Sequence, residues 1–290
     1  MRYITVDTKL IALLGTPLRQ SVSYLLQNQV FEELGVDFCY FPVEISNEKE
    51  LSTVVKGLRH MNFAGFAVTK PYKETIIPCL DEVDRTVMKM GACNTVSFLD
   101  GKLIGHNTDG IGCIRSLERD YALTLPGKRY VSLGAGGAAR AICFELAEHG
   151  AAHIAITALA GMAEKLAEEI NGHFPGLCTA FPITQQDKVH HAVLQADVLM
   201  NLTGLGMIPY EEETPIQADW FQTGQFCYDA IYMPEKTRFL QDAERAGCQI
   251  ANGLGMVIYQ GLEQIRLWTG MDASAETMFR ALEKHILVKR

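Results

Sequence analysis

The chain has 290 residues, of which 48% are hydrophobic and 21% charged, and its formal net charge is −8. This length suffices for one large or two ordinary domains with real cores. The acidic balance argues against nucleic acid and anionic membranes as main partners. The eight cysteines show no metal-ligand spacing, so we expect buried, reduced thiols and no metal site. Without a signal-peptide pattern or a membrane-spanning apolar run, we expect a cytoplasmic protein.

Segments with strand and helix patterns alternate along the first part of the chain, which is typical of an α/β domain. Strands are expected at 9–15, 39–45 and 63–69, and a hairpin at 95–104 turns around Leu99-Asp100-Gly101. Helices are expected at about 25–34, from Asn47 to about 60, and at 110–121.

A second alternation begins after Leu125-Pro126-Gly127, a composition typical of a domain boundary. Its expected strands cover 129–133, 151–159, 177–183, 197–202, 226–231 and 249–251. Its expected helices cover 138–149, 160–171, 187–196 and 237–246. A helical pattern from 255 to 290 is interrupted at Thr269-Gly270.

A glycine signature lies where the first strand of this second series meets its helix. Gly134, Gly136 and Ala139 fill the G-x-G-x-x-G/A template of dinucleotide-binding loops. The glycines allow a tight turn and close backbone approach to a pyrophosphate, and the helix N-terminus offers N–H groups to the anion. A plain strand–turn–helix junction is the alternative. We expect dinucleotide binding by the whole loop, which comprises Gly134, Ala135, Gly136, Gly137, Ala138 and Ala139.

The end of the next strand normally decides between the two nicotinamide dinucleotides. An acidic residue there binds the ribose 2′-hydroxyl of NAD, and an Arg binds the 2′-phosphate of NADP. The stretch from Ile154 to Met162 contains no Lys, Arg, Asp or Glu, and we expect Lys165 to lie about two turns inside the following helix. The cofactor is therefore NAD or NADP, with NAD slightly favoured.

Two polar islands in the first part of the chain contain candidates for proton transfer. Asp109 lies in the run from Gly105 to Gly112, and Lys73 ends the run from Phe66. A dehydrogenase acting on a secondary alcohol must move a proton, and a Lys oriented by a carboxylate can do so. The alternatives are a helix cap for Asp109 and a solvated surface position for Lys73.

Ser21 and Ser23 follow Gly15-Thr16-Pro17 at an expected helix start. Both hydroxyls could donate to a substrate carboxylate, and capping of the helix is an equally good local explanation.

Taken together and in order, these islands resemble the shikimate dehydrogenase family, including the quinate/shikimate dehydrogenases. The resemblance extends over essentially the whole chain. The matching segments are Gly15–Ser23, Gly65–Lys73, Gly91–Val96, Gly105–Gly112, Gly134–Ala139, Asn201–Met207, Ile231–Pro234, Gly253–Gln260 and Leu267–Gly270.

The resemblance implies an α/β fold with two α/β domains. A substrate-binding domain would cover 1–110 and be completed by C-terminal helices at 255–290, and a Rossmann-like NAD(P)-binding domain would cover 111–254. It implies reversible hydride transfer between 3-dehydroshikimate or 3-dehydroquinate and shikimate or quinate. The implied catalytic residues are Lys73 and Asp109. The implied substrate-binding residues are Ser21, Ser23, Thr69, Asn94, Tyr232 and Gln260. Thr203 and Gly253 join the glycine loop as implied cofactor-binding residues.

Several positions depart from the family pattern. Ala67 replaces the usual Asn before Val-Thr, Gln20 a His and Tyr24 a Pro, and the Asn-Arg-Thr cluster that grips the 2′-phosphate is absent. These departures leave open a regulatory paralogue that binds a shikimate-like acid, or a dehydrogenase for an amino analogue. In each case we expect a cyclohexene or cyclohexane carboxylic acid as ligand and a monomer or homodimer.

Overall fold

The structure is a computed structural model that describes residues 4–19, 21–159 and 161–288. The chain divides into two compact units. Unit 1 comprises Met1–Thr108 and Ile258–Arg290, and unit 2 comprises Asp109–Val257. The segment Leu125-Pro126-Gly127 lies within unit 2.

Unit 1 is built on a six-stranded mixed sheet with the order β2-β1-β3-β5-β6-β4. Its strands are β1 (Lys9–Gly15), β2 (Phe38–Glu44), β3 (Phe63–Val68), β4 (Glu82–Val83), β5 (Thr95–Leu99) and β6 (Lys102–His106). β1 is parallel to both β2 and β3, whereas β5 is antiparallel to β3 and β6. The hairpin predicted at 95–104 is confirmed.

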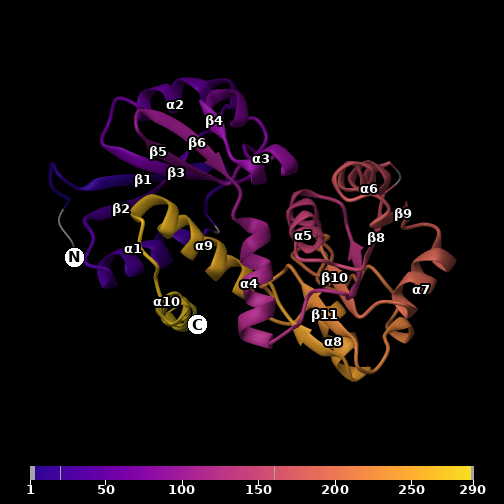
Figure 1. The fold of residues 1–290 in the computed structure, drawn as a ribbon. Coiled ribbons are helices and arrows are strands. Elements are labelled where there is room, and N and C mark those ends of the chain that lie inside the picture. Colours follow the sequence, from indigo (N-terminus) through magenta and orange to yellow (C-terminus); the bar gives the residue numbers. More distant parts are fainter. Residues whose placement is uncertain (1–3, 20, 160, 289–290) are drawn as a thin grey trace. The chain divides into compact units, whose positions relative to one another are not determined.

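Helices cover both faces of this sheet (Figure 1). They are α1 (Ser23–Glu33), α2 (Leu51–Leu58), α3 (Arg85–Met90), α9 (Leu254–Thr269) and α10 (Ala275–Val288), with short 3₁₀ turns η1 (Glu48–Glu50) and η2 (Ile77–Cys79). α2 packs Leu51 and Val55 into a core with Phe66 of β3. On α9, the indole of Trp268 donates to the Val96 carbonyl at 3.0 Å, which fixes this helix to the sheet.

Unit 2 contains six parallel strands in the order β12-β11-β10-β7-β8-β9. They are β7 (Arg129–Leu133), β8 (His153–Ala158), β9 (Cys178–Pro182), β10 (Val198–Asn201), β11 (Phe226–Asp229) and β12 (Gln249–Ala251). The order reverses between β7 and β10, which makes a doubly wound Rossmann sheet with its switch point there.

The helices of unit 2 are α4 (Asp109–Tyr121), α5 (Gly137–Glu148), α6 (Met162–His173), α7 (Gln186–Leu194) and α8 (Arg238–Arg245), with a 3₁₀ turn η3 (Ala218–Trp220). α7, α8 and η3 pack Val193, Phe239 and Trp220 against one face of the sheet. α4 packs on α5 so closely that a Cβ at Gly110 would lie 2.4 Å from the Ala141 carbonyl oxygen.

The α/β class and the Rossmann-like second part are confirmed. β4 and α3 were not predicted; the side chain of Asp84 caps α3 by accepting from the backbone N–H of Thr86. The expected start of α6 at residue 160 is wrong, because Gly161 adopts a φ of +83° and the helix begins at Met162. Lys165 is consequently in the first turn of α6 rather than two turns inside it.

Candidate active site

Thr69 and Lys73 lie on the turn that follows β3. The backbone N–H of Thr69 donates to the Leu14 carbonyl at 2.9 Å, and the Lys73 carbonyl accepts from the backbone N–H of Cys93 at 2.7 Å. Cys93 precedes Asn94, whose carbonyl accepts from the N–H of Val68 at 2.8 Å. These backbone bonds place three predicted site residues, Thr69, Lys73 and Asn94, on directly bonded segments of unit 1.

The side chain of Asn94 is the centre of a buried polar network. Its Oδ1 accepts from the Thr108 backbone N–H at 2.9 Å and from Thr95 Oγ1 at 2.8 Å, while its Nδ2 donates to Thr108 Oγ1 at 3.0 Å. Thr108 Oγ1 in turn donates to Gln260 Oε1 at 3.4 Å. The structure thus brings together Asn94 and Gln260, two predicted substrate-binding residues that are far apart in sequence.

Two further glutamines, which the sequence did not reveal, extend this network. Gln264 Nε2 donates to Thr95 Oγ1 at 3.0 Å, and Gln27 Nε2 donates to Gln264 Oε1 at 2.9 Å. Gln27 and Gln264 are both buried, and their amide side chains link α1 to α9 and α9 to β5. Such links join residues more than 160 positions apart.

Asp109 is the first residue of α4, and it follows Thr108 directly. The neighbouring Asn107 donates from Nδ2 to the Ala92 carbonyl at 2.9 Å, which fixes the approach to the helix. Lys73 belongs to unit 1 and Asp109 to unit 2, and their joint action in proton transfer stays a prediction.

Ser21 and Ser23 face one another, with 2.6 Å between their Oγ atoms. Val22 stands at the N-cap of α1, and neither serine caps the helix through its side chain. A Cβ on Gly15 would lie 2.4 Å from Thr69 Cγ2, so the β1 end that leads to these serines packs on the Thr69 turn. Gln20, one of the departures from the family pattern, lies outside the described residues.

Replacing both Ser21 and Ser23 by Ala is expected to raise the KM of the carboxylate substrate while leaving Tm nearly unchanged. Each hydrogen bond to a carboxylate contributes roughly 1.5–3 kcal/mol, and no cap is lost because Val22 holds that position. KM and Tm are measured on the same double variant. A lower Tm with an unchanged KM would assign the serines to helix capping instead.

The predicted glycine loop joins β7 to α5 at the switch point of the parallel sheet. Gly134 has a φ of +124°, and a Cβ there would lie 2.6 Å from the Leu202 carbonyl oxygen. Gly136 is the N-cap of α5, and a Cβ at Gly136 or Gly137 would meet no atom within 4 Å. Ala139 is fully buried against the sheet. An exposed glycine backbone at the start of a 12-residue helix fits the pyrophosphate of a dinucleotide.

A buried carboxylate, Asp229, connects the loops beside this turn. Its Oδ2 accepts from Asn201 Nδ2 at 2.9 Å and from Thr237 Oγ1 at 2.6 Å, and its Oδ1 accepts from the backbone N–H of Ile231 at 2.9 Å. Asn201 Oδ1 also accepts from the Thr203 hydroxyl at 2.6 Å. Burial raises the pKa of Asp229 to about 6, which leaves it mostly ionised at neutral pH and matched to its three donors.

The remaining predicted residues of unit 2 lie around this carboxylate. Thr203 is held through Asn201, and Tyr232 follows Ile231. Gly253 donates its N–H to the Ile231 carbonyl at 3.1 Å, and a Cβ there would lie 2.1 Å from the Ala230 carbonyl oxygen. The structure thus places Gly134, Thr203, Tyr232 and Gly253 after the carboxyl ends of β7, β10, β11 and β12, the edge at which Rossmann sheets bind ligands.

The end of β8 is apolar and exposed, with 69% of Leu159 accessible. The side chain of Glu164 turns back to accept from the Gly161 N–H at 2.9 Å, which places a carboxylate at this loop. Arg140, near the start of α5, forms an ion pair with Glu169 of α6. Ala160 lies outside the described residues.

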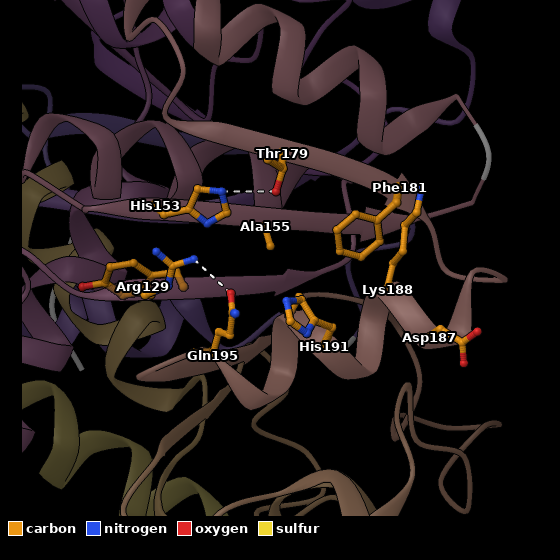
Figure 2. Close-up of a pocket in the computed structure, with 12 residues that line it drawn as sticks. Arg129, His153, Ala155, Thr179, Phe181, Asp187, Lys188, His191 and Gln195 are labelled. Atoms are coloured by element: carbon orange, nitrogen blue, oxygen red, sulfur yellow. Dashed lines mark hydrogen bonds between the residues drawn. The ribbon is translucent and has the colours of Figure 1, made fainter.

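Unit 2 also contains a cavity of about 580 Å³ between α7 and strands β7 to β9 (Figure 2). It reaches Arg129 and His153, the first residues of β7 and β8, and none of the predicted site residues lines it. Arg129 donates to Gln195 at 3.4 Å and His153 shares a hydrogen bond with Thr179 at 3.2 Å. Because dinucleotides bind at the carboxyl ends of such strands, this cavity is not the cofactor site.

Within the described residues, no group of three or more His, Cys, Asp or Glu side chains could hold a metal ion. In the same part of the chain, no helix combines the length and hydropathy needed to cross a bilayer.

A doubly wound parallel sheet with an open glycine loop, joined to a second α/β unit with a buried amide and hydroxyl cluster, defines a two-unit oxidoreductase of the NAD(P)-binding class. Family models agree: residues 13–96 match the shikimate dehydrogenase substrate binding domain, and residues 253–283 match the shikimate 5′-dehydrogenase C-terminal domain.

Individual relatives cover nearly the whole chain. The shikimate dehydrogenase (NADP(+)) of Moorella thermoacetica is 40% identical over 287 residues, which are 98% of this chain and 96% of that protein. The structure of shikimate 5-dehydrogenase from Listeria monocytogenes in complex with shikimate and NAD is 36% identical, with a TM-score of 0.93 over 97% of this chain and 99% of that one. Quinate dehydrogenase from Corynebacterium glutamicum in complex with NAD is 27% identical, with a TM-score of 0.88 over 96% of this chain and 99% of that one. The chain belongs to the shikimate dehydrogenase family.

Proposed function

We propose that this protein is an NAD(P)-dependent dehydrogenase that interconverts shikimate and 3-dehydroshikimate, with unit 1 binding the acid and unit 2 the dinucleotide. The observation that supports the proposal is the match to a shikimate dehydrogenase over nearly the whole chain. Lys73 and Asp109 stand in the two segments that resemble the family's catalytic segments, and the glycine loop is open. A protein that only binds the acid would have no need for a proton-transfer pair.

In the proposed site the chain's own residues bind the acid and move the proton. Ser21 and Ser23 hold the carboxylate, and Thr69, Asn94, Gln260 and Tyr232 contact the ring. Lys73 takes the proton from the hydroxyl oxygen that becomes a ketone and returns it in the reverse direction, and Asp109 orients Lys73. Hydride transfer is the chemistry that a bound nicotinamide supplies. Gly134 to Ala139, Thr203 and Gly253 hold that cofactor.

The test is an activity matrix of shikimate and quinate, each against NAD and NADP. We expect turnover with shikimate. Binding of shikimate without turnover in any combination would replace the proposal by a regulatory binding protein. Turnover of quinate alone would group the chain with enzymes such as the quinate dehydrogenase of Corynebacterium glutamicum instead.

We further propose that NAD is used at least as well as NADP. A 2′-phosphate needs a cation in place of its water, and the β8 end presents Leu159 and the carboxylate of Glu164 instead. The nearest arginine on α5, Arg140, is engaged with Glu169. The relatives include examples of both cofactors. The Moorella thermoacetica enzyme is named for NADP(+), and the structure of the Listeria monocytogenes enzyme contains NAD.

Titration of wild type with both cofactors should give an NAD affinity at least equal to the NADP affinity. An NADP preference of about tenfold or more, equivalent to about 1.4 kcal/mol, would mean that the 2′-phosphate has a partner and would overturn the proposal. Lys165 is exposed in the first turn of α6 and is the cation nearest in sequence to the end of β8. It is therefore the residue that could bind the 2′-phosphate of NADP. A Lys165→Ala variant that loses NADP affinity tenfold and keeps NAD affinity would show that Lys165 grips the phosphate, and would overturn the stated preference. Leu159→Arg is the complementary variant, and it should shift the preference towards NADP.

A further inference from the structure

Asp229 is placed where three separate segments of unit 2 converge. It is the last residue of β11, and in the parallel register it lies beside Asn201, the last residue of β10. Asn201 is also the register partner of Leu133, which precedes the glycine loop. One carboxylate therefore sits at the carboxyl edge of the sheet, directly next to the switch point.

Each oxygen of this carboxylate fixes a different part of the predicted site. Through Asn201 it holds the segment that contains Thr203, and through the backbone N–H of Ile231 it holds the approach to Tyr232. Thr237, whose hydroxyl donates to Asp229, caps α8 by accepting from the Leu240 N–H at 3.4 Å. Asp229, Asn201 and Thr237 are all 0–1% exposed.

The glycine loop rests on the same assembly. The Leu202 N–H donates to the Leu133 carbonyl at 2.8 Å, and only the absence of a Cβ lets Gly134 approach the Leu202 carbonyl. A shift of Asn201 would therefore move Leu202 against Gly134 as well as displace Thr203.

We infer that Asp229, with Asn201 and Thr237, is the positioning group that sets the geometry of the cofactor site and of the Tyr232 segment. It touches neither ligand itself. The inference rests on the proposed dinucleotide-dependent function and adds to it three residues outside the set that the family resemblance implies.

The test compares four variants by direct dinucleotide titration with NADH and NADPH, independent of turnover. Asp229→Asn replaces one carboxylate oxygen by an N–H₂ group, which cannot accept from the donors that point at it. Thr237→Val removes the hydroxyl that donates to Asp229 and caps α8, with little change of shape. Thr237→Ser retains that donor. Gln225→Leu is the matched structural control, because Gln225 is buried just before β11 and bonds Val193 and Ala196 at the amino end of the sheet.

We expect Asp229→Asn and Thr237→Val to raise the dinucleotide Kd about tenfold or more, the usual effect of losing a hydrogen bond to a charged group. Thr237→Ser should bind as wild type, and Gln225→Leu should lower Tm with an unchanged Kd. The inference would be overturned if folded Asp229→Asn and Thr237→Val bound the dinucleotide with the wild-type Kd. It would also be overturned if Gln225→Leu raised the dinucleotide Kd by as much as they do. If Asp229→Asn does not fold, the inference is decided by comparing the dinucleotide Kd of Thr237→Val with that of Thr237→Ser. A wild-type protein that binds neither dinucleotide would instead overturn the proposed cofactor.

Discussion

Lys73→Ala is expected to lower kcat by on the order of 10²–10⁴-fold, the range for loss of a general acid–base group, with a smaller change in substrate binding. The reason is that oxidation of a ring hydroxyl must remove a proton from oxygen, and Lys73 is the proposed acceptor. Its turn is fixed through the backbone bond of its carbonyl to Cys93, so a side-chain truncation leaves the segment in place. Steady-state kinetics at saturating substrate and cofactor measure the effect.

Two companion variants separate proton transfer from charge. Lys73→Arg keeps the positive charge but cannot give up a proton near neutral pH, so it should lose turnover almost as fully as Lys73→Ala. Lys56→Ala removes an exposed lysine of α2 in the same unit and should leave kcat unchanged. Near wild-type kcat in Lys73→Ala would contradict the assignment, and rescue by Arg would show that charge alone matters.

The fold could be predicted wherever short-range patterns decide it. Strand β7 and the start of α5 were located from an apolar run and a glycine turn, because a left-handed Gly134 and an N-capping Gly136 leave the chain few alternatives at that point. The predicted start of α6 was wrong because the positive φ of Gly161, rather than the apolar periodicity, determines where that helix begins.

The ends of β10 and β11 were predicted too far along the chain, at Leu202 and Ile231, and the cause is the same in both. Asn201 and Asp229 end their strands by accepting from the backbone N–H of the residue two positions on, Thr203 and Ile231. Apolar residues follow each of them, so hydropathy alone continues the strand.

This local misassignment is also why Asn201 and Asp229 were missed as site residues. A single polar residue inside an expected strand does not indicate a functional site. Two polar residues at the carboxyl ends of neighbouring strands do indicate one, because Rossmann sheets bind ligands at that edge. Only the register of β10 against β11 shows that they are neighbours. Gln27 and Gln264 were missed for a related reason, since 237 positions separate them and no local pattern indicates that their amides meet.

Gly136→Ala is expected to weaken dinucleotide binding by tenfold or more while leaving Tm unchanged. At Gly136 φ is −77°, an ordinary value for alanine, and the added Cβ would meet no atom of the protein within 4 Å. The fold therefore tolerates the methyl group. The same open space is where the backbone must approach the pyrophosphate, and a methyl group there would hold the anion away from the N–H groups of α5.

Gly134→Ala should behave differently, because its φ of +124° and the Leu202 carbonyl 2.6 Å away leave no room for a Cβ. We expect it to lose at least ~2 kcal/mol of unfolding free energy as well as dinucleotide affinity. Gly172→Ala is the control, since it adds a methyl group with no neighbour within 4 Å on α6, away from the loop. Thermal unfolding and titration with NADH are measured on all three variants. Unchanged affinity in Gly136→Ala would mean that the pyrophosphate does not lie over this loop, and the dinucleotide site would have to be sought elsewhere on unit 2.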